Sequence, residues 1–465
     1  MLILSLLLAA APADQAIETA LASAGPGTRI GLVVTDDQGQ EIVAIRPDDR
    51  FVPASNTKMF TTAAAFATLD TDAADGGGGA SVRLEGRDVV LAGHGDARLS
   101  GAADCVIDCL LDLAKAIAAR TRVVRDVIGD DSAFPDERWP QGMSWNNIPS
   151  RYGTAISALT IDDNTLRIAV TPGTAGAAPT IAGDGYYRID NRATTGGARA
   201  TLGVERMPNS DVLRVAGMIP AGAEPATLTV ALDDPAHRAA WVLAAMLRTL
   251  GVRVTGEVAV RHRPLSPSDD PATRGDAPAP RPPEPPVLAR LAAPPLAADL
   301  LLTNKVSQNL HAELLLRRVG AVAGSGSVAD GQRVVTAMLE SAGVARWTYD
   351  FADGSGMSNY NRITPRGTVK FLRWTQGQPW GAAWRGTLPV GGVDGTVARR
   401  FRGTALDGKL FAKTGTLNAA NALSGFMTAA SGRTLIFSAL ANDMPGDASA
   451  TKAVDAALLA IAAAN

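Results

Sequence analysis

The pattern of apolar and polar residues predicts strands near both ends of this 465-residue chain. At the start, the helix-like segment 14–24 precedes two alternating segments, 28–35 and 41–46, which flank a turn. At the end, three further segments are interpreted as strands joined by turns before an alanine-rich final helix, and these are 409–413, 421–429 and 434–441. We expect the two groups to pair as one five-stranded antiparallel sheet with the terminal helices on a face, in a multidomain α/β (α+β) chain.

A buried helix is predicted after Ser55, because residues 59–66 are apolar or threonine on every side. Ser55 could simply cap this helix, and the same position would place it at the positive end of the helix dipole, where N–H groups can receive an oxyanion. Lys58 lies three residues later on the same helix face, roughly 5–6 Å away at Cβ, so its amine can reach the Ser55 hydroxyl. Burial lowers the pKa of a lysine toward the range where the neutral amine accepts a proton. We therefore expect Lys58 to act as general base.

Three short strings stand in an order typical of serine enzymes that penicillin acylates. They read S-x-x-K at 55–58, S-x-N at 307–309 and K-T-G at 413–415, and the S-x-N string follows a helix-like segment that suggests an all-helical lobe. A second S-x-x-K at 449–452 comes after K-T-G, so we interpret it as a coincidence and Lys452 as a solvated lysine of the final helix. Because the chain has only seven lysines, finding one at both expected places is informative.

Other catalytic chemistries lack their signatures in this sequence. No G-x-S-x-G elbow occurs, and the chain has only four histidines, which argues against a Ser-His-Asp triad on an α/β-hydrolase scaffold. His311 lies near the S-x-N string, and we expect it to be a packed or solvated side chain and not a catalyst. No H-E-x-x-H or paired C-x-x-C spacing is present, so we expect no metal and no cofactor.

The composition points to an exported protein without a nucleic-acid partner. The net charge of −2 and the lack of a basic cluster give no reason to expect nucleic-acid binding. Residues 1–13 resemble a short signal peptide, with an apolar run before the small-residue site Ala11-Pro12-Ala13, although no basic residue precedes the run. No other segment approaches the roughly 18 apolar residues of a membrane span, so we expect a periplasmic or otherwise extracytoplasmic protein without a transmembrane anchor.

The two cysteines, Cys105 and Cys109, leave their redox state open. Four residues apart on a regular helix, their Cα atoms would lie roughly 6 Å from each other, near the outer limit for a disulfide. An exported pair could be oxidised, and two small buried thiols are the alternative. A bridge becomes the better interpretation if Cys105 lies in a loop before the helix.

About 250 residues separate the serine helix from the S-x-N string, and the catalytic strings do not need them. This insertion opens with four glycines at 76–79 and contains several β-rich segments. Proline dominates 269–286, which we interpret as a linker that returns to the catalytic domain. We expect a leader at 1–13 and a catalytic domain split between 14–78 and 287–465. A β-rich domain II, at 79–169 and 218–268, would enclose an inner domain III at 170–217. The linker is 269–286.

Six further segments, in order along the chain, are similar to segments of one family: 93–96, 129–134, 156–159, 309–313, 353–358 and 388–396. Together with the three strings, they make the chain resemble the D-alanyl-D-alanine carboxypeptidases/endopeptidases of the class C low-molecular-mass penicillin-binding proteins. Each glycine- and aspartate-rich segment by itself indicates only a turn. The resemblance implies a penicillin-binding, serine β-lactamase-like domain with two nested insertions, the inner one being the 170–217 segment above.

The resemblance also implies a role for each residue of the strings. Ser55 is the nucleophile, Lys58 its base, and Ser307 relays a proton to the leaving D-alanine. Asn309 holds the acyl amide, whereas the substrate's terminal carboxylate is bound by the last string. The implied residues of that string are Lys413 and Thr414 for the carboxylate, Gly415 for room beside the strand, and Thr416, whose N–H would form the oxyanion hole with that of Ser55.

Three functions are compatible with these residues. The leading hypothesis is a serine DD-peptidase that acts on peptidoglycan peptides and is acylated by β-lactams. A β-lactamase or esterase on the same scaffold would differ by rapid deacylation, and a catalytically inert wall-binding protein would be expected to have a broken string, which this chain does not. The sequence does not distinguish carboxypeptidase from endopeptidase activity, because both attack a D-alanyl bond, and it leaves the oligomeric state unknown.

Overall fold

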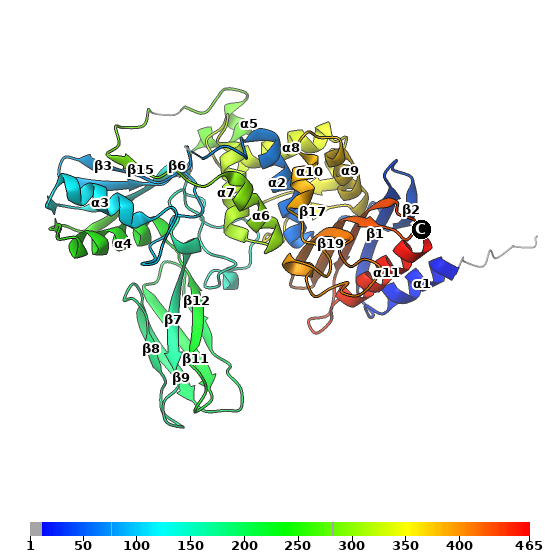
Figure 1. Cartoon of the computed structure of the whole chain (residues 1–465), viewed down its shortest axis with the longest axis horizontal. Coiled ribbons are helices and arrows are strands. Elements are labelled where there is room, and N and C mark those ends of the chain that lie inside the picture. Colours follow the sequence, from blue (N-terminus) through cyan, green and yellow to red (C-terminus); the bar gives the residue numbers. More distant parts are fainter. Residues whose placement is uncertain (1–11, 76, 281–282) are drawn as a thin grey trace, which may run out of the picture. The chain divides into compact units, whose positions relative to one another are not determined.

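The computed structural model describes residues 12–75, 77–280 and 283–465 (Figure 1). The chain divides into two compact units. The first, here called the sheet unit, comprises the described residues of Met1–Ala67 together with Leu300–Gln308 and Val334–Asn465. The second, here called the inserted unit, comprises Thr68–Asp299 and Asn309–Arg333.

The sheet unit is built on a five-stranded antiparallel sheet, as the sequence predicted. Its strand order is β18-β19-β20-β1-β2, so the first and last parts of the chain meet where β1 pairs with β20. The bounds are β1 (Arg29–Asp36), β2 (Glu41–Ile45), β18 (Leu410–Leu417), β19 (Ala420–Thr428) and β20 (Thr434–Asn442). Strand β18 forms one edge of this sheet.

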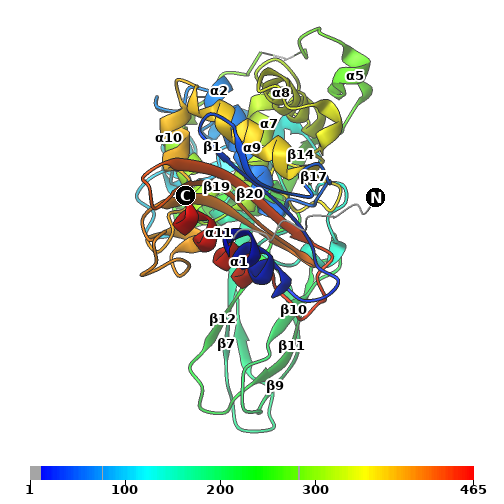
Figure 2. The same cartoon turned by 90° about the vertical axis from the view of Figure 1, so that its right-hand side faces the viewer.

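Helices cover both faces of this sheet (Figure 2). Helices α1 (Pro12–Ala22) and α11 (Thr451–Ala464) pack against each other on one face, where Leu32 and Leu458 belong to the same buried apolar cluster. Helix α9 (Pro365–Gln376) covers the opposite face, and its Pro365 leaves no space for a side chain at Gly31. Because β1 is buried on both faces, its sequence is a nearly continuous apolar run.

The remaining elements of the sheet unit lie between β2 and β18 in sequence. They are η1 (Ala54–Asn56), α2 (Thr57–Thr68), η5 (Arg346–Thr348), β16 (Tyr349–Asp350), β17 (Arg362–Ile363), α10 (Gly381–Gly386) and η6 (Gly395–Val397). Where the chain passes between the two units it forms three helices, which are α6 (Leu296–Lys305), α7 (Asn309–Gly320) and α8 (Val328–Ser341).

The inserted unit contains a second five-stranded sheet, which mixes parallel and antiparallel pairs. Its order is β14-β6-β4-β3-β15, and two helices, α3 (Leu110–Arg120) and α4 (Pro235–Thr249), pack with it. The bounds are β3 (Ser81–Glu85), β4 (Asp88–Ala92), β6 (Val127–Pro135), β14 (Val258–Arg263) and β15 (Ala289–Arg290), beside the short pair β5 (Val123–Val124) and β13 (Arg253–Val254). This part of the chain is therefore β-rich, as the sequence indicated, and also carries helices.

Two three-stranded sheets complete the inserted unit, with the orders β10-β11-β9 and β12-β7-β8. Their strands are β7 (Thr165–Thr171), β8 (Thr180–Ala182), β9 (Arg188–Thr195), β10 (Gly203–Glu205), β11 (Val212–Ile219) and β12 (Ala226–Ala231). Figure 1 draws these strands together in green. The expected domain boundaries, including 170–217 for domain III, stay a prediction.

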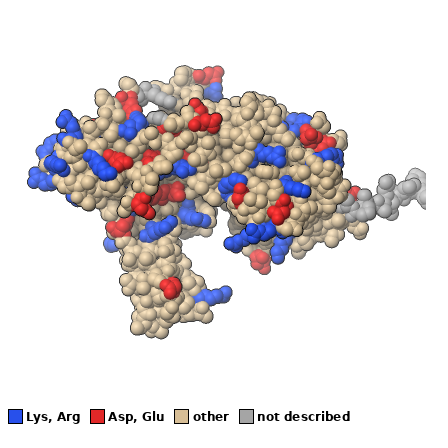
Figure 3. Space-filling model, in the orientation of Figure 1, with Lys and Arg blue, Asp and Glu red and all other residues tan. Residues whose placement is uncertain are grey.

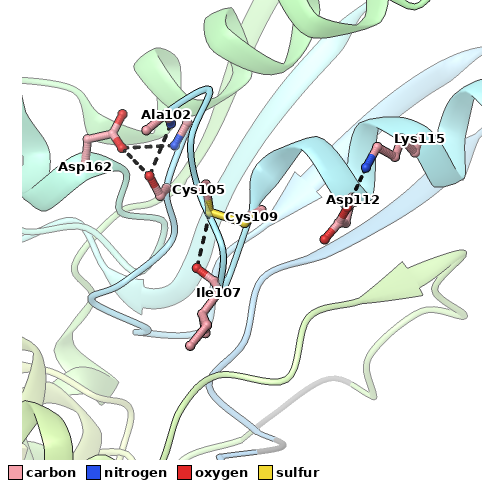
Figure 4. The surroundings of a disulfide bond; sticks show 9 residues. Ala102, Cys105, Ile107, Cys109, Asp112, Lys115 and Asp162 are labelled. Atoms are coloured by element: carbon pink, nitrogen blue, oxygen red, sulfur yellow. Dashed lines mark hydrogen bonds and ion pairs between the residues drawn. A yellow bond between two sulfur atoms is a disulfide. The ribbon is translucent and has the colours of Figure 1, made fainter.

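Cys105 and Cys109 form a disulfide, which settles the question that their spacing left open (Figure 4). Their Cα atoms lie 5.7 Å apart. Helix α3 begins at Leu110 with Cys109 at its N-cap, so both cysteines belong to the loop before the helix and not to a regular helix. The neighbouring loop is held by Asp162, which accepts hydrogen bonds from the Ser100 hydroxyl and the Gly101 N–H.

The described residues of the proline-rich segment, 269–280 and 283–286, contain little regular structure. The short η4 (Pro267–Asp269) and the single-turn α5 (Pro271–Arg274) lie at its start, and two isolated 3-10 turns, η2 (Trp145–Asn147) and η3 (Asp162–Asn164), occur elsewhere in the unit. Residues 1–11 of the expected signal peptide lie outside the described residues. Among the residues that the structure describes, no helix is long and apolar enough to cross a membrane.

Candidate active site

Ser55 and Lys58 meet at the start of helix α2, as their spacing predicted. Ser55 lies in the 3-10 turn η1, directly before α2, and it is half-buried. The Lys58 side chain is completely buried, and its Nζ lies 3.0 Å from the Ser55 Oγ. Lys58 also donates a hydrogen bond to the backbone carbonyl of Ser355, over 2.6 Å. The predicted nucleophile and the predicted base are thus in direct contact.

Lys413 and Ser307 form a second contact in the sheet unit. Lys413 lies on β18 and is completely buried, and its Nζ donates to the Ser307 Oγ at 2.9 Å and to the carbonyl of Thr414 at 3.0 Å. Ser307 has a positive φ of 62°, an uncommon backbone conformation for a serine. The first residue of the S-x-N string and the first residue of K-T-G are therefore adjacent in space.

Two buried lysines in one unit affect each other's charge. Burial, and then the charge of Lys58, hold the pKa of Lys413 well below its usual value. No carboxylate among the described residues lies within ion-pair distance of Lys413. This amine is consequently suited to bind an anion, because an incoming carboxylate would supply the missing counter-charge.

The serine turn is fixed to strand β18 by close contacts. The side-chain amide of Asn56 donates to the carbonyl of Lys413 over 2.8 Å. At Gly415 an added Cβ would lie only 2.5 Å from the carbonyl oxygen of Pro53, so this position has no room for a side chain. The sequence had suggested that Gly415 makes room for substrate, and the structure shows in addition that it lets the serine turn approach the strand.

Thr414 and Thr416 occupy the exposed part of the same edge strand. The Thr414 hydroxyl forms a hydrogen bond of 2.7 Å with the hydroxyl of Thr396, and Thr416 is solvent-exposed. Thr396, Asn56 and the Ser355 carbonyl were not among the predicted site residues. Thr396 and Ser355 lie in the segments 388–396 and 353–358, which contributed to the family resemblance but were given no role in the site.

Asn309 belongs to the inserted unit, although it follows Ser307 by two residues. It begins helix α7, and its side-chain amide donates to the carbonyl of Tyr152 over 2.9 Å. In the same helix His311 is buried and contacts Asp163 at 3.0 Å, so it is a packed side chain, as expected. Its contacts with Asp163 and Asp299 raise its pKa, although burial, the largest influence, opposes them.

The second S-x-x-K string lies apart from these contacts. Ser449 bonds Asn421 and Thr451, whereas Lys452 is an exposed residue near the start of α11. This confirms the interpretation of Lys452 as a solvated lysine. No group of three or more metal-binding side chains occurs among residues 12–75, 77–280 and 283–465.

Comparisons with known proteins agree with this geometry. The model of the D-Ala-D-Ala carboxypeptidase 3 (S13) family matches residues 13–465. A D-alanyl-D-alanine carboxypeptidase from Actinomadura sp. (strain R39) is 34% identical over 91% of this chain and 79% of its own length. The D-alanyl-D-alanine carboxypeptidase DacB of Haemophilus influenzae is 25% identical over 88% of this chain and 85% of its own.

The fold is similar to that of solved penicillin-binding proteins. The crystal structure of penicillin binding protein 4 from Haemophilus influenzae has a TM-score of 0.79 at 21% identity and covers 96% of this chain and 98% of its own. The family match over nearly the whole chain and the Actinomadura relative therefore establish that this chain belongs to the D-Ala-D-Ala carboxypeptidase 3 (S13) family and is a serine DD-peptidase.

Proposed function

We propose that Ser55 is the nucleophile of this serine DD-peptidase and that the enzyme cleaves D-alanyl bonds in peptidoglycan stem peptides outside the cytoplasm. The observation that carries the proposal is the 3.0 Å contact between the buried Lys58 Nζ and the Ser55 Oγ. A serine hydroxyl is a weak nucleophile until a neighbouring base removes its proton. The contact supplies such a base without any cofactor.

In the acylation step the neutral Lys58 amine takes the Ser55 proton while Oγ attacks the carbonyl carbon of the penultimate D-alanine. The carbonyl π electrons move to the oxygen, which the N–H groups of Ser55 and Thr416 stabilise as an oxyanion. When the tetrahedral intermediate collapses, the C–N bond breaks and the departing amine takes a proton through Ser307. Water then hydrolyses the acyl-serine ester in a second step.

Substrate recognition is assigned to the other strings. Lys413 and Thr414 bind the terminal carboxylate, for which the absence of a carboxylate near Lys413 within the described residues leaves the ammonium available. Asn309 holds the acyl amide. The edge position of β18 supports pairing of an extended peptide along Gly415 and Thr416.

Release of a terminal D-alanine and cleavage of a D-alanyl cross-link use the same acylation chemistry. Carboxypeptidase activity is the better supported of the two, because the Actinomadura and Haemophilus relatives are both named D-alanyl-D-alanine carboxypeptidases. Acylation by β-lactams is part of the proposal, and the Haemophilus protein has been solved with a β-lactam. The Cys105–Cys109 disulfide supports an extracytoplasmic location, because disulfides persist in oxidising compartments.

The test is the intact mass of the purified protein after mixing with benzylpenicillin. We expect one long-lived adduct on the unsubstituted protein and none on the S55A variant, which removes only the attacking oxygen. The matched control is S449A, which alters the second S-x-x-K string and should be acylated like the unsubstituted protein.

Other outcomes have definite meanings. An adduct that persists on S55A would refute this nucleophile. A short-lived adduct with hydrolysed drug would favour a β-lactamase, and an unsubstituted protein that forms no adduct and hydrolyses no drug would favour an inert wall-binding protein. Release of D-alanine from a peptide that ends in D-alanyl-D-alanine then measures the carboxypeptidase activity directly.

A further inference from the structure

The turn 353–356 of the sheet unit contacts the general base through backbone atoms. This turn belongs to none of the three catalytic strings of the sequence. Two consecutive carbonyls of this turn accept hydrogen bonds from helix α2. The Ser355 carbonyl accepts from the Lys58 Nζ at 2.6 Å, and the Gly354 carbonyl accepts from the Thr61 Oγ1 at 2.7 Å. Two side chains one helical turn apart on α2 therefore bind neighbouring backbone carbonyls of one short loop.

Asp353 fixes the shape of this turn. Its carboxylate is almost completely buried, with 2% of the residue exposed. One carboxylate oxygen accepts from the Gly356 N–H at 2.9 Å and from the Asn361 side-chain amide at 2.6 Å, and the other accepts from the Ser358 N–H at 2.7 Å. Three donors thus bind the Asp353 carboxylate, and none of these donors belongs to Ser55 or Lys58.

Gly356 shows how tightly the turn fits against the nucleophile. Its φ is +88°, and an added Cβ would lie 1.9 Å from the carbonyl oxygen of Ala54, the residue before Ser55. Neither the backbone conformation nor the available space admits a side chain. A change in the path of the turn would therefore reach Ser55 and Lys58 together.

A carbonyl at this place has a chemical consequence for the base. A neutral lysine amine has two N–H donors and one lone pair, so donating one N–H to the Ser355 carbonyl restricts rotation about the Cε–Nζ bond. The lone pair can then be directed at the Ser55 hydroxyl. When the Oγ–H bond breaks and the third Nζ–H bond forms, the same carbonyl stabilises the new ammonium group. An aspartate does both of these things for the histidine of a Ser-His-Asp triad.

We propose that Asp353 is a positioning residue that holds the Ser355 carbonyl against Lys58 and so orients the base and stabilises its protonated form. The proposal rests on the proposed function, because it concerns the base of that reaction. The surroundings of this lysine in the sheet unit include another buried lysine and the Asp353 turn. Lys413 on β18 opposes its positive charge, and the buried carboxylate of Asp353 lies behind the turn that contacts it.

The test compares the second-order rate constant of acylation by benzylpenicillin as a function of pH for the unsubstituted protein and D353N. The substitution keeps the size of the side chain and removes one acceptor and the negative charge. We expect the plateau rate to fall by about 100-fold, at the lower end of the contribution of a positioned general base. We also expect the acid limb to move to lower pH, because an ammonium that loses a favourable acceptor gives up its proton more easily.

The shift of the acid limb separates positioning from a purely structural role. A variant that is only partly folded would lose amplitude at every pH and keep the same midpoint, and that result would overturn the proposal. The matched control is D350N, which removes a half-buried carboxylate of the same segment that pairs with Arg346 and Arg50 and should leave rate and midpoint unchanged.

A second variant guards against failure of D353N to fold. N361A removes one of the three donors to Asp353 and leaves the carboxylate in place, so it should shift the acid limb in the same direction by a smaller amount. An unshifted profile in the folded variants would overturn the role of Asp353 while leaving the proposed function intact. Absence of acylation in the unsubstituted protein would instead overturn the proposed function.

Discussion

Buried cations have different partners in the two units. In the sheet unit, the fully buried Lys58 and Lys413 donate to hydroxyl and backbone carbonyl oxygens. In the inserted unit, buried arginines lie against carboxylates, in the pairs Arg83 with Asp130, Arg206 with Asp233, Arg274 with Asp330 and Arg317 with Glu313. On the face drawn in Figure 3, acidic and basic side chains also lie side by side in many places.

The kind of partner affects how easily a buried cation can change its charge or bind another group. A carboxylate partner stabilises the charged form of a buried cation and removes its freedom to exchange protons or bind another anion. Neutral oxygen partners leave the protonation state adjustable, at a cost in stability. Under the proposed function, the buried arginines of the inserted unit hold its fold, whereas the buried lysines of the sheet unit take part in the chemistry. Substitutions in the two units should have opposite effects on stability and activity.

The largest effect on stability is expected for R206M in the inserted unit. The Arg206 side chain is completely buried against Asp233 and donates to the carbonyl of Ala231 over 3.0 Å. Its removal leaves the buried Asp233 carboxylate without its partner, which should lower the free energy of unfolding by about 3–5 kcal/mol. Chemical denaturation measures this loss, and hydrogen exchange should locate it in strands β10 and β12. The acylation rate of the folded protein should not change.

A double variant tests the cause of that loss. Replacing Asp233 by Asn in the R206M protein removes the uncompensated charge and should recover most of the stability. If R206M alone is as stable as the unsubstituted protein, or if it loses acylation while still folded, the division between structural and reactive charges is wrong.

K413M should produce the opposite combination in the sheet unit. Methionine fills a similar volume without burying an amine, so we expect the free energy of unfolding to rise by about 1 kcal/mol. Loss of a charge-assisted hydrogen bond to the substrate carboxylate, worth about 1.5–3 kcal/mol, should raise KM for a peptide ending in D-alanyl-D-alanine by about 10- to 100-fold. A substrate with an amidated C-terminus is the control, since it should lose much less.

The pH dependence of KM checks the same residue without a substitution. Burial and Lys58 lower the pKa of Lys413 in the free enzyme, and a bound carboxylate raises it again. Above the free-enzyme pKa, substrate binding therefore requires uptake of a proton. KM should then rise with pH by up to about tenfold per unit, and K413M should lack this rise. A KM that falls as pH rises would contradict the assignment of Lys413.

The sequence predicted the contact between Ser55 and Lys58 but not the buried ion pairs of the inserted unit, for physical reasons. Ser55 and Lys58 are one helical turn apart, so local geometry sufficed to predict their contact. The apolar and polar pattern of the segments that form β1, β2 and β18–β20, together with the turns between them, predicted the sheet in the same way. The Ser355 carbonyl is a backbone atom with no residue type to mark it. The pair Arg206 and Asp233 joins positions 27 residues apart in a unit whose topology the periodicity did not determine.

The cysteines show where spacing alone is insufficient. Their separation of four residues left a bridge open and favoured it if Cys105 lay in a loop before the helix, and a helix start is among the least certain features of a sequence. The structure places that start at Leu110, and the bridge follows. Helices α3 and α4 of the inserted unit were not predicted, because the segments around them are β-rich in sequence.

The double variant C105S/C109S should change stability and leave activity unchanged, and it tests the comparison at the surface of the inserted unit. The bridge closes a five-residue loop, for which the chain-entropy relation gives about 2 kcal/mol. Acylation should be unaffected. V106S is the matched control, because Val106 lies in the same ring and is 89% exposed.

The pH at which this loss is measured should matter, because the ring also contains the buried Asp108. Burial, and then the contact with Asp108, raise the pKa of Asp96 to about 9. A carboxyl group that binds its proton more tightly in the folded state destabilises the fold increasingly as pH rises from about 4 toward about 9. Opening the ring lets Asp108 move away from Asp96 and relieves the part of this penalty that comes from Asp108, while burial of Asp96 stays. The variant should therefore lose about 2 kcal/mol near pH 5 and less near pH 8, whereas a loss that grows with pH would show that the bridge does not hold these two carboxyl groups together.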